Sequence, residues 1–220
     1  MNLILLGPPG AGKGTLAGYI KESLGILHIS TGDILREEIK NNTDLGIEAK
    51  GFIDKGELVP DDLVIKLIEK VLTKESNRKL GYMLDGFPRN ESQAKKLDEI
   101  LKKINKPIDQ ALYLDSPLPI VIKRLTGRRV CRKCGAVFHV TNRPPKKQNI
   151  CDVCGGELYQ REDDNEQTIK NRMEVYQNST KPVVEFYKKK NILRTLDGDQ
   201  ESESLHDDLL KALNEDGKIH

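Results

Sequence analysis

A glycine-rich segment near the N-terminus carries the first residues whose spacing could do chemistry. Gly7–Thr15 reads GPPGAGKGT, follows the apolar run Asn2–Leu6 directly and precedes a helical pattern. Glycines here let backbone N–H groups converge on phosphate oxygens, and a helix N-terminus adds partial positive charge. Lys13 is placed to neutralise the β and γ phosphates of a nucleotide. The segment predicts a P-loop, with a glycine turn that binds nothing as the alternative.

The residues that could hold a metal ion depart from the commonest P-loop pattern. A hydroxyl usually follows the lysine and ligates Mg²⁺, but Gly14 stands there and Thr15 comes one position later. This spacing disfavours a GTPase or a motor ATPase and leaves Mg²⁺ held mainly by phosphates and water. Asp85 ends an apolar run, so it could hold Mg²⁺ through water or could serve as a turn or helix-capping residue.

Arginines spread along the chain suggest a second anion beside the nucleotide. Phosphoryl transfer between two nucleotides brings two polyanions together, and guanidinium groups supply fixed bidentate donors for them. Such a reaction needs positioning and charge neutralisation rather than a covalent intermediate. Any one arginine alone could simply be a solvated surface residue. The candidates are Arg36, Arg89, Arg128, Arg161 and Arg172.

Four cysteines form two C-x-x-C pairs. Cys131 and Cys134 make the first pair, Cys151 and Cys154 the second, and 16 residues separate them. This spacing predicts a zinc site, and four thiolates make a closed site in which zinc is structural. Disulfides and free thiols are the alternatives.

Short apolar runs alternate with helical patterns over the whole chain. This alternation predicts an α/β fold with a doubly wound parallel sheet. Two stretches do not fit the alternation, 31–60 and 128–164, and we interpret them as insertions on the core. The expected strands are Asn2–Leu6, Leu27–Ser30, Tyr82–Asp85, Gln110–Asp115 and Ile192–Leu196, and the clearest helical patterns are Asp61–Thr73, Asn90–Ile104 and Ser204–Leu213.

Composition limits the classes of protein. The 220 residues suit one domain with small insertions, and 36 basic residues against 34 acidic ones leave a net charge of only +2. A balanced charge, 5% aromatic residues and no Trp argue against a nucleic-acid binder. No apolar run approaches the roughly 20 residues that span a bilayer, so we expect a cytoplasmic protein without membrane contact.

Together these motifs carry a family resemblance over essentially the whole chain. The chain resembles adenylate kinases of the long type with a zinc-bearing lid, as found in Gram-positive bacteria. The segments that carry it are Gly7–Thr15, Ile29–Asp33, Gly56–Pro60, Leu84–Arg89 with Gln93, Leu125–Arg129, the four cysteines and Tyr159–Asp164.

The resemblance implies a P-loop core with a five-stranded parallel sheet and two inserted mobile subdomains. These are a nucleoside-monophosphate-binding insertion at 30–60 and a zinc-bearing lid at 127–164. It implies that AMP is bound by Thr31, Arg36, Glu57, Leu58, Val59, Gly86, Phe87, Pro88, Arg89, Gln93, Arg161 and Arg172. It places Gly10, Ala11, Gly12, Lys13, Gly14, Thr15, Arg124, Arg128, Val137, Phe138 and Gln200 around ATP. Catalysis would use Lys13, Arg89, Arg128, Arg161 and Arg172, with Asp163 and Asp164 organising the lid arginines on closure.

The implied activity is Mg²⁺-dependent, reversible phosphoryl transfer from ATP to AMP, which gives two ADP. The adenine preference rests on Thr31 and Gln93 by resemblance alone. Another nucleoside monophosphate kinase, acting on UMP, CMP or GMP, is the nearest alternative. A zinc-ribbon ATPase that binds nucleic acid and a plain ATPase are more distant ones. We expect a monomer with structural zinc whose ligands are ATP, AMP and ADP, and no nucleic-acid partner.

Overall fold

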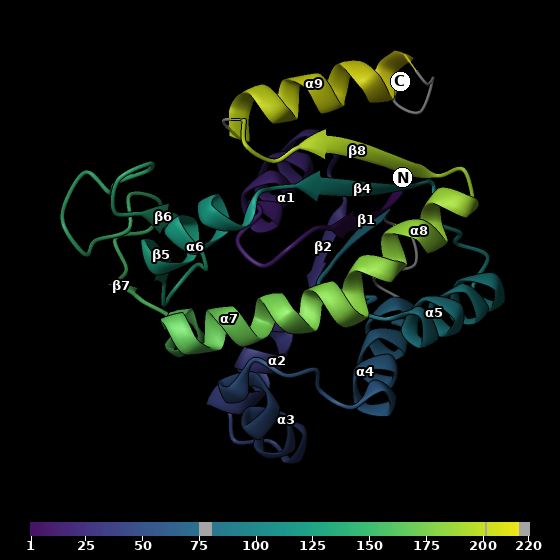
Figure 1. Cartoon of the computed structure of the whole chain (residues 1–220), viewed down its shortest axis with the longest axis horizontal. Coiled ribbons are helices and arrows are strands. Elements are labelled where there is room, and N and C mark those ends of the chain that lie inside the picture. The colour runs from purple at the N-terminus through teal and green to yellow at the C-terminus, as the bar shows by residue number, and fades with distance from the viewer. Residues whose placement is uncertain (75–80, 201, 216–220) are drawn as a thin grey trace.

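A parallel sheet forms the centre of the molecule. The computed structural model describes residues 1–74, 81–200 and 202–215. The five strands lie in the order β2-β3-β1-β4-β8 (Figure 1). The predicted doubly wound α/β fold is confirmed, and only the last strand is displaced, by one residue. The strands are β1 Asn2–Leu6, β2 Leu27–Ser30, β3 Tyr82–Asp85, β4 Gln110–Asp115 and β8 Leu193–Asp197.

Helices cover both faces of the sheet, which explains why its central strands are mostly apolar rather than alternating. Along β1, Leu3 and Leu5 pack with residues of α1 (Lys13–Leu24) and α9 (Ser202–Glu215). Ile4 and Leu6 belong to the cluster on the opposite face. That cluster is built with α4 (Asp61–Thr73), α5 (Glu91–Lys103) and α8 (Lys181–Lys189).

The helix limits lie close to the predicted ones. The predicted helix Asp61–Thr73 is confirmed at both ends. The pattern over Asn90–Ile104 becomes α5 with Asn90 as its N-cap, because the Asn90 Oδ1 accepts a hydrogen bond from the Gln93 N–H at 2.8 Å. The C-terminal helix α9 begins and ends about one half-turn beyond the predicted Ser204–Leu213.

A pair of short helices lies between β2 and α4. These are α2 (Thr31–Lys40) and α3 (Asp44–Lys55), and they pack closely against each other. A Cβ atom at Gly46 would lie 2.2 Å from the Glu38 carbonyl oxygen, so only glycine allows this approach. Thr31 and Arg36 of α2 lie near Gly86, the residue that follows β3.

A separate antiparallel sheet lies between α6 (Leu118–Thr126) and α7 (Glu166–Val175). Its order is β6-β5-β7, with β5 Arg128–Cys131, β6 Val137–His139 and β7 Leu158–Tyr159. Figure 1 shows it apart from the main sheet, at the end of the long α7–α8 helical segment. Within the described ranges, no helix is both long and apolar enough to cross a membrane.

The segment Tyr176–Thr180 joins α7 to α8 as a single π-helical turn. The Lys181 N–H donates to the Tyr176 carbonyl, five residues earlier, in place of the usual four-residue spacing. The Thr180 hydroxyl donates to the Arg89 carbonyl at 2.9 Å. The turn therefore holds the backbone of the loop that follows β3.

Candidate active site

The glycine-rich segment forms a loop between β1 and α1, as predicted. Gly10 and Gly12 have positive φ angles of 81° and 96°, a conformation that other residues rarely adopt. A Cβ at Gly10 would also lie 2.8 Å from the Leu125 side chain. Gly12 is the N-cap of α1 and has no side chain to cap it, so the first N–H groups of the helix face the loop.

Lys13 crosses this loop and carries an unusual charge environment. Its Nζ donates to the carbonyl oxygens of Gly7 at 2.8 Å and Pro8 at 2.9 Å. Burial lowers the pKa of Lys13 to about 8, and the positive charges of Arg89, Arg172 and Arg128 add to this, against the opposite effect of Asp85. The predicted P-loop lysine thus lies within electrostatic reach of three of the predicted arginines.

The lowered pKa predicts a pH profile. Only protonated Lys13 attracts phosphate, so kcat/KM for ATP is expected to fall up to tenfold per pH unit from about pH 8 upward. An ordinary lysine would stay charged to about pH 10.4. Phosphate groups titrate near pH 6 and are already ionised in this range.

The measurement is a pH series of initial rates at low ATP, for the wild type and for Lys13→Arg. The variant keeps its charge, so its activity should be lower overall but flat between pH 8 and 9.5. A wild-type profile that stays flat to pH 10 would contradict this assignment.

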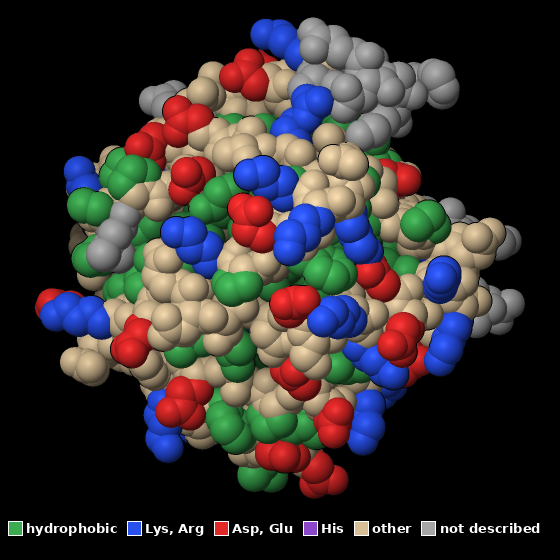
Figure 2. All heavy atoms as spheres, turned by 45° about the vertical axis from the view of Figure 1, so that its right-hand side comes forward, with side chains coloured by type: hydrophobic (Ala, Val, Ile, Leu, Met, Phe, Trp, Pro, Cys, Tyr) green, Lys and Arg blue, Asp and Glu red, His purple; other side chains and the backbone are tan. Residues whose placement is uncertain are grey.

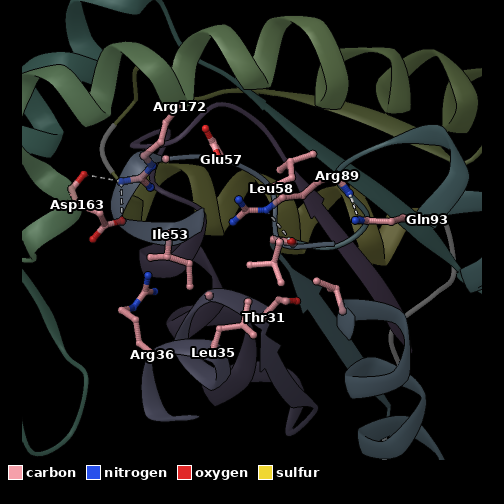
Figure 3. A pocket seen from close by; sticks show the side chains of 15 residues that line it. Thr31, Leu35, Arg36, Ile53, Glu57, Leu58, Arg89, Gln93, Asp163 and Arg172 are labelled. Carbon is pink, nitrogen blue, oxygen red and sulfur yellow. Dashed lines mark hydrogen bonds and ion pairs between the residues drawn. The ribbon is translucent and has the colours of Figure 1, made fainter. Parts of the chain in front are cut away.

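A pocket opens at the carboxyl end of β3, next to Gly86 and Arg89. Figure 3 shows side chains of Arg36, Arg89 and Arg172 reaching it from three different elements. Thr31 Oγ1 is buried and, within the described residues, has no hydrogen-bond partner. Of the residues expected to bind AMP, the pocket is lined by Thr31, Arg36, Glu57, Leu58, Val59, Gly86, Arg89, Gln93 and Arg172, whereas Phe87, Pro88 and Arg161 are not part of its lining.

Arg89 and Gln93 are fixed by hydrogen bonds around the start of α5. The Arg89 Nε donates to the Gly86 carbonyl at 2.9 Å, and burial lowers the pKa of this guanidinium. The Gln93 side chain accepts from the Arg89 N–H at 2.7 Å and donates to Asp61 Oδ1 at 2.7 Å. Gln93 therefore has one amide hydrogen left with which to contact a ligand.

Buried carboxylates hold the arginines of α7 and of the small sheet. Asp164, whose side chain is fully buried, accepts from Arg128 Nε at 2.8 Å and lies 3.4 Å from Arg172 Nη1. Asp163 accepts from Arg172 at 2.9 Å. Burial opposes ionisation of Asp163, but the surrounding arginines, Arg172 first, hold its pKa below the usual value. Both of these carboxylates are therefore paired with arginines.

Asp85 lies at the end of β3 with a neighbour that the sequence did not suggest. His28 on β2 places its Nε2 3.6 Å from Asp85 Oδ2. Burial opposes ionisation of Asp85, yet His28 and Lys13 lower its pKa, so it is an anion. No helix begins for several residues after Asp85, so the helix-capping alternative is wrong.

The residues expected around ATP fall into two groups. Arg124 donates to the Gly198 carbonyl at 2.6 Å and lies 3.5 Å from the Ala11 carbonyl, so it joins the P-loop to the turn that contains Gln200. Val137 and Phe138 lie in β6, and Phe138 is buried in the small core of that sheet. The structure brings Arg124 to the P-loop and places Phe138 elsewhere.

The four cysteines come together at one point of the small sheet. All four Sγ atoms lie within 4.8 Å of one another, with 3.5 Å between Cys131 and Cys154 and 3.6 Å between Cys134 and Cys151. Thiolates about 2.3 Å from a tetrahedral zinc ion would be about 3.8 Å apart. Burial opposes ionisation of Cys131, but nearby backbone N–H groups lower its pKa to about 6. The cluster is compatible with zinc, and the disulfide alternative is not seen, since all four thiols are unbridged.

Several residues that line the pocket were not predicted from the sequence. Gly32, Leu35, Ile53, Gly56 and Val64 also line the pocket. Gly32 and Gly56 lie inside segments that carried the family resemblance, so their glycines were an available signal. The three apolar residues look like ordinary core positions of amphipathic helices, which gave no reason to select them.

Comparison with known proteins agrees with this geometry. A family model described as adenylate kinase matches residues 5–192. An adenylate kinase of Methanocella arvoryzae is 53% identical over 97% of this chain and 98% of its own length. Adenylate kinases of Caldicellulosiruptor bescii and Archaeoglobus fulgidus are each 52% identical, over 97% and 93% of this chain and 99% and 94% of their own lengths. Similarity on this scale, over nearly the full chain and around a P-loop with a second cationic pocket, shows that the chain belongs to the adenylate kinase family of phosphotransferases.

Proposed function

We propose that this protein transfers the γ-phosphoryl group of Mg·ATP to AMP, and catalyses the reverse reaction. The observation that supports it best is the position of the arginine-lined pocket. Arg89 and Arg172 line that pocket, and the same two charges act on Lys13 of the P-loop. Two phosphate sites that share their charges are what a direct transfer between two nucleotides needs.

In the proposed mechanism the protein contributes position and charge. The P-loop N–H groups and Lys13 would hold the donor phosphates. Arg36, Arg89, Arg161 and Arg172 would hold the AMP phosphate in line with them. Arg128 and Arg172, both fixed by Asp164, would stabilise charge on the transferring group. Asp85 would hold Mg²⁺ through water, and the ion would supply positive charge against the donor phosphates.

Two segments are proposed to act as covers. Residues 30–60 would bind the monophosphate and residues 127–164 would form a lid over ATP, which includes Val137 and Phe138. Closure of both would exclude water and favour transfer to AMP over hydrolysis. The four cysteines would hold a structural zinc ion that keeps the lid folded, because its core contains few apolar side chains.

Incubation of the purified protein with Mg²⁺ and ADP alone tests the function. Equal amounts of ATP and AMP are expected, because only a nucleotide-to-nucleotide transferase can disproportionate ADP. The same incubation with Arg89→Ala should form product at least a hundredfold more slowly. Phosphate release without ATP would indicate hydrolysis and overturn the proposal.

Another acceptor base is the nearest competing function. AMP is proposed on the basis of Thr31 and Gln93, which can offer only a few hydrogen bonds to the base. Rates with UMP, CMP and GMP in place of AMP, at saturating ATP, would decide it. A rate with any of these equal to that with AMP would contradict the adenine preference.

Nucleic-acid binding is the more distant alternative. Figure 2 shows positive and negative side chains interspersed over one face, an arrangement unlike the basic stripe of a duplex binder. Binding to an oligonucleotide that weakens with salt would support this alternative. We further propose a cytoplasmic monomer, which sedimentation of the purified protein and fractionation of cells would test.

A further inference from the structure

Asp33 joins two arginines that come from distant parts of the chain. Its Oδ1 accepts from Arg36 Nη2 at 2.6 Å and from Arg161 Nη2 at 3.0 Å. Arg36 lies one turn further along α2, whereas Arg161 lies 128 positions away, beyond the small antiparallel sheet. One carboxylate oxygen therefore holds two guanidinium groups at a single point.

These two guanidinium groups would otherwise repel each other. Burial lowers the pKa of Arg161 to about 10, and the positive charge of Arg36 contributes to this lowering while Asp33 opposes it. Burial alone would raise the pKa of Asp33, but the two arginines lower it to about 2. Asp33 is thus an anion over the whole working range of pH, and its charge offsets the repulsion.

The contact uses only part of what the arginines can donate. Arg36 lines the pocket, and the buried Arg161 Nε has no hydrogen-bond partner within the described residues. The Asp33 side chain is 55% exposed, compared with 12% for Arg161, so it holds the pair from the solvent side. The remaining N–H groups are available to an anion on the inner side.

We infer that Asp33 is a positioning residue for the acceptor phosphate, which holds Arg36 and Arg161 together at the distance that a nucleoside monophosphate requires. The inference rests on the proposed function, which assigns these two arginines to AMP. Asp33 and Arg161 belong to the two segments proposed to close over the substrates, so their contact offsets the repulsion between the arginines when the segments close on the phosphate. The phosphate, and not the base, is therefore the part of AMP that depends on Asp33.

The test is Asp33→Asn, compared with Asp54→Asn. Asp54 pairs with Lys50 on the exposed side of α3, so its variant makes the same charge change in the same segment without touching the pocket. In Asp33→Asn, KM for AMP is expected to rise about tenfold, and KM for ATP to change less than twofold. Calorimetry should show a matching loss of AMP affinity, whereas adenosine, which has no phosphate, should bind as to the wild type.

Each other outcome has a defined meaning. Unchanged or tighter AMP binding in Asp33→Asn would overturn the positioning role. Asp33 would then have no effect on AMP binding, or would compete with the phosphate for the two arginines. An equal loss of AMP and adenosine affinity, seen also in Asp33→Ala, would show a general defect of α2 and would also overturn it. Asp33→Glu should restore part of the AMP affinity. A wild-type protein that fails to bind AMP would overturn the proposed function itself, together with this role.

Discussion

Replacing Lys13 with methionine is expected to lower kcat by about 10³-fold or more with little change in folding. Lys13 is the P-loop cation, and its ammonium group lies where two loop carbonyls, Gly7 and Pro8, hold it. Methionine has nearly the same length and keeps the apolar contacts of the side chain, so the main loss is the charge. That charge would act on the transferring phosphoryl group, where charge builds up in the transition state.

The measurement is kcat in both reaction directions together with a melting curve. Lys21→Met is the matched control, because Lys21 lies on the exposed side of the same helix and the net charge changes equally. The control should keep wild-type kcat. Wild-type kcat in Lys13→Met would remove Lys13 from the proposed mechanism, and a melting temperature lowered by more than about 10 °C would show a folding role instead.

Removal of metal from the cysteine cluster is expected to lower the melting temperature by about 10 °C or more and to leave most turnover at low temperature. The small core at the cluster is made of buried Cys131, Cys151, Phe138 and Leu158, too few apolar groups to fold the lobe alone. The cluster also lies apart from the arginine pocket, so the metal would take no part in the transfer. Its loss should therefore act through unfolding of the lobe as the temperature rises.

The experiment compares a chelator-treated protein and Cys134→Ser with Val153→Ala. Val153 is 69% exposed and lies between Cys151 and Cys154, so the control keeps all four cysteines. Zinc content, melting temperature and turnover at 10–15 °C are measured on each. Turnover abolished at low temperature with an unchanged melting curve would contradict a purely structural metal.

Local sequence patterns predicted the strands, the main helices and the P-loop of this protein well. The P-loop, the strands and the cysteine pairs could be predicted because each depends on a few neighbouring residues. A glycine turn, an apolar strand and a C-x-x-C pair are all local patterns. The helix Asp61–Thr73 was predicted to the residue for the same reason: Pro60 and two acidic residues mark its start.

The pairing of charges could not be predicted in this way. The contact of Asp33 with Arg161 depends on where α2 and the small sheet lie in space, and no spacing in the chain encodes it. His28 meets Asp85 only because β2 and β3 are neighbours in the sheet order, a matter of topology rather than pattern. The arginines were recognised as a set, but their partners required the fold.

The π-helical turn at Tyr176–Thr180 sets the rotation of one helix relative to the next. An α-helix turns by about 100° per residue, so the one extra residue in this turn offsets the faces of α7 and α8 by that angle. The offset lets Tyr187 of α8 face the core while Arg172 of α7 faces the pocket. Deleting one residue here, such as Gln177, is expected to rotate α7 relative to α8 by about 100° without removing either helix. We expect this variant to keep its core and its melting temperature. Its Arg172 would point away from the pocket, and turnover would fall.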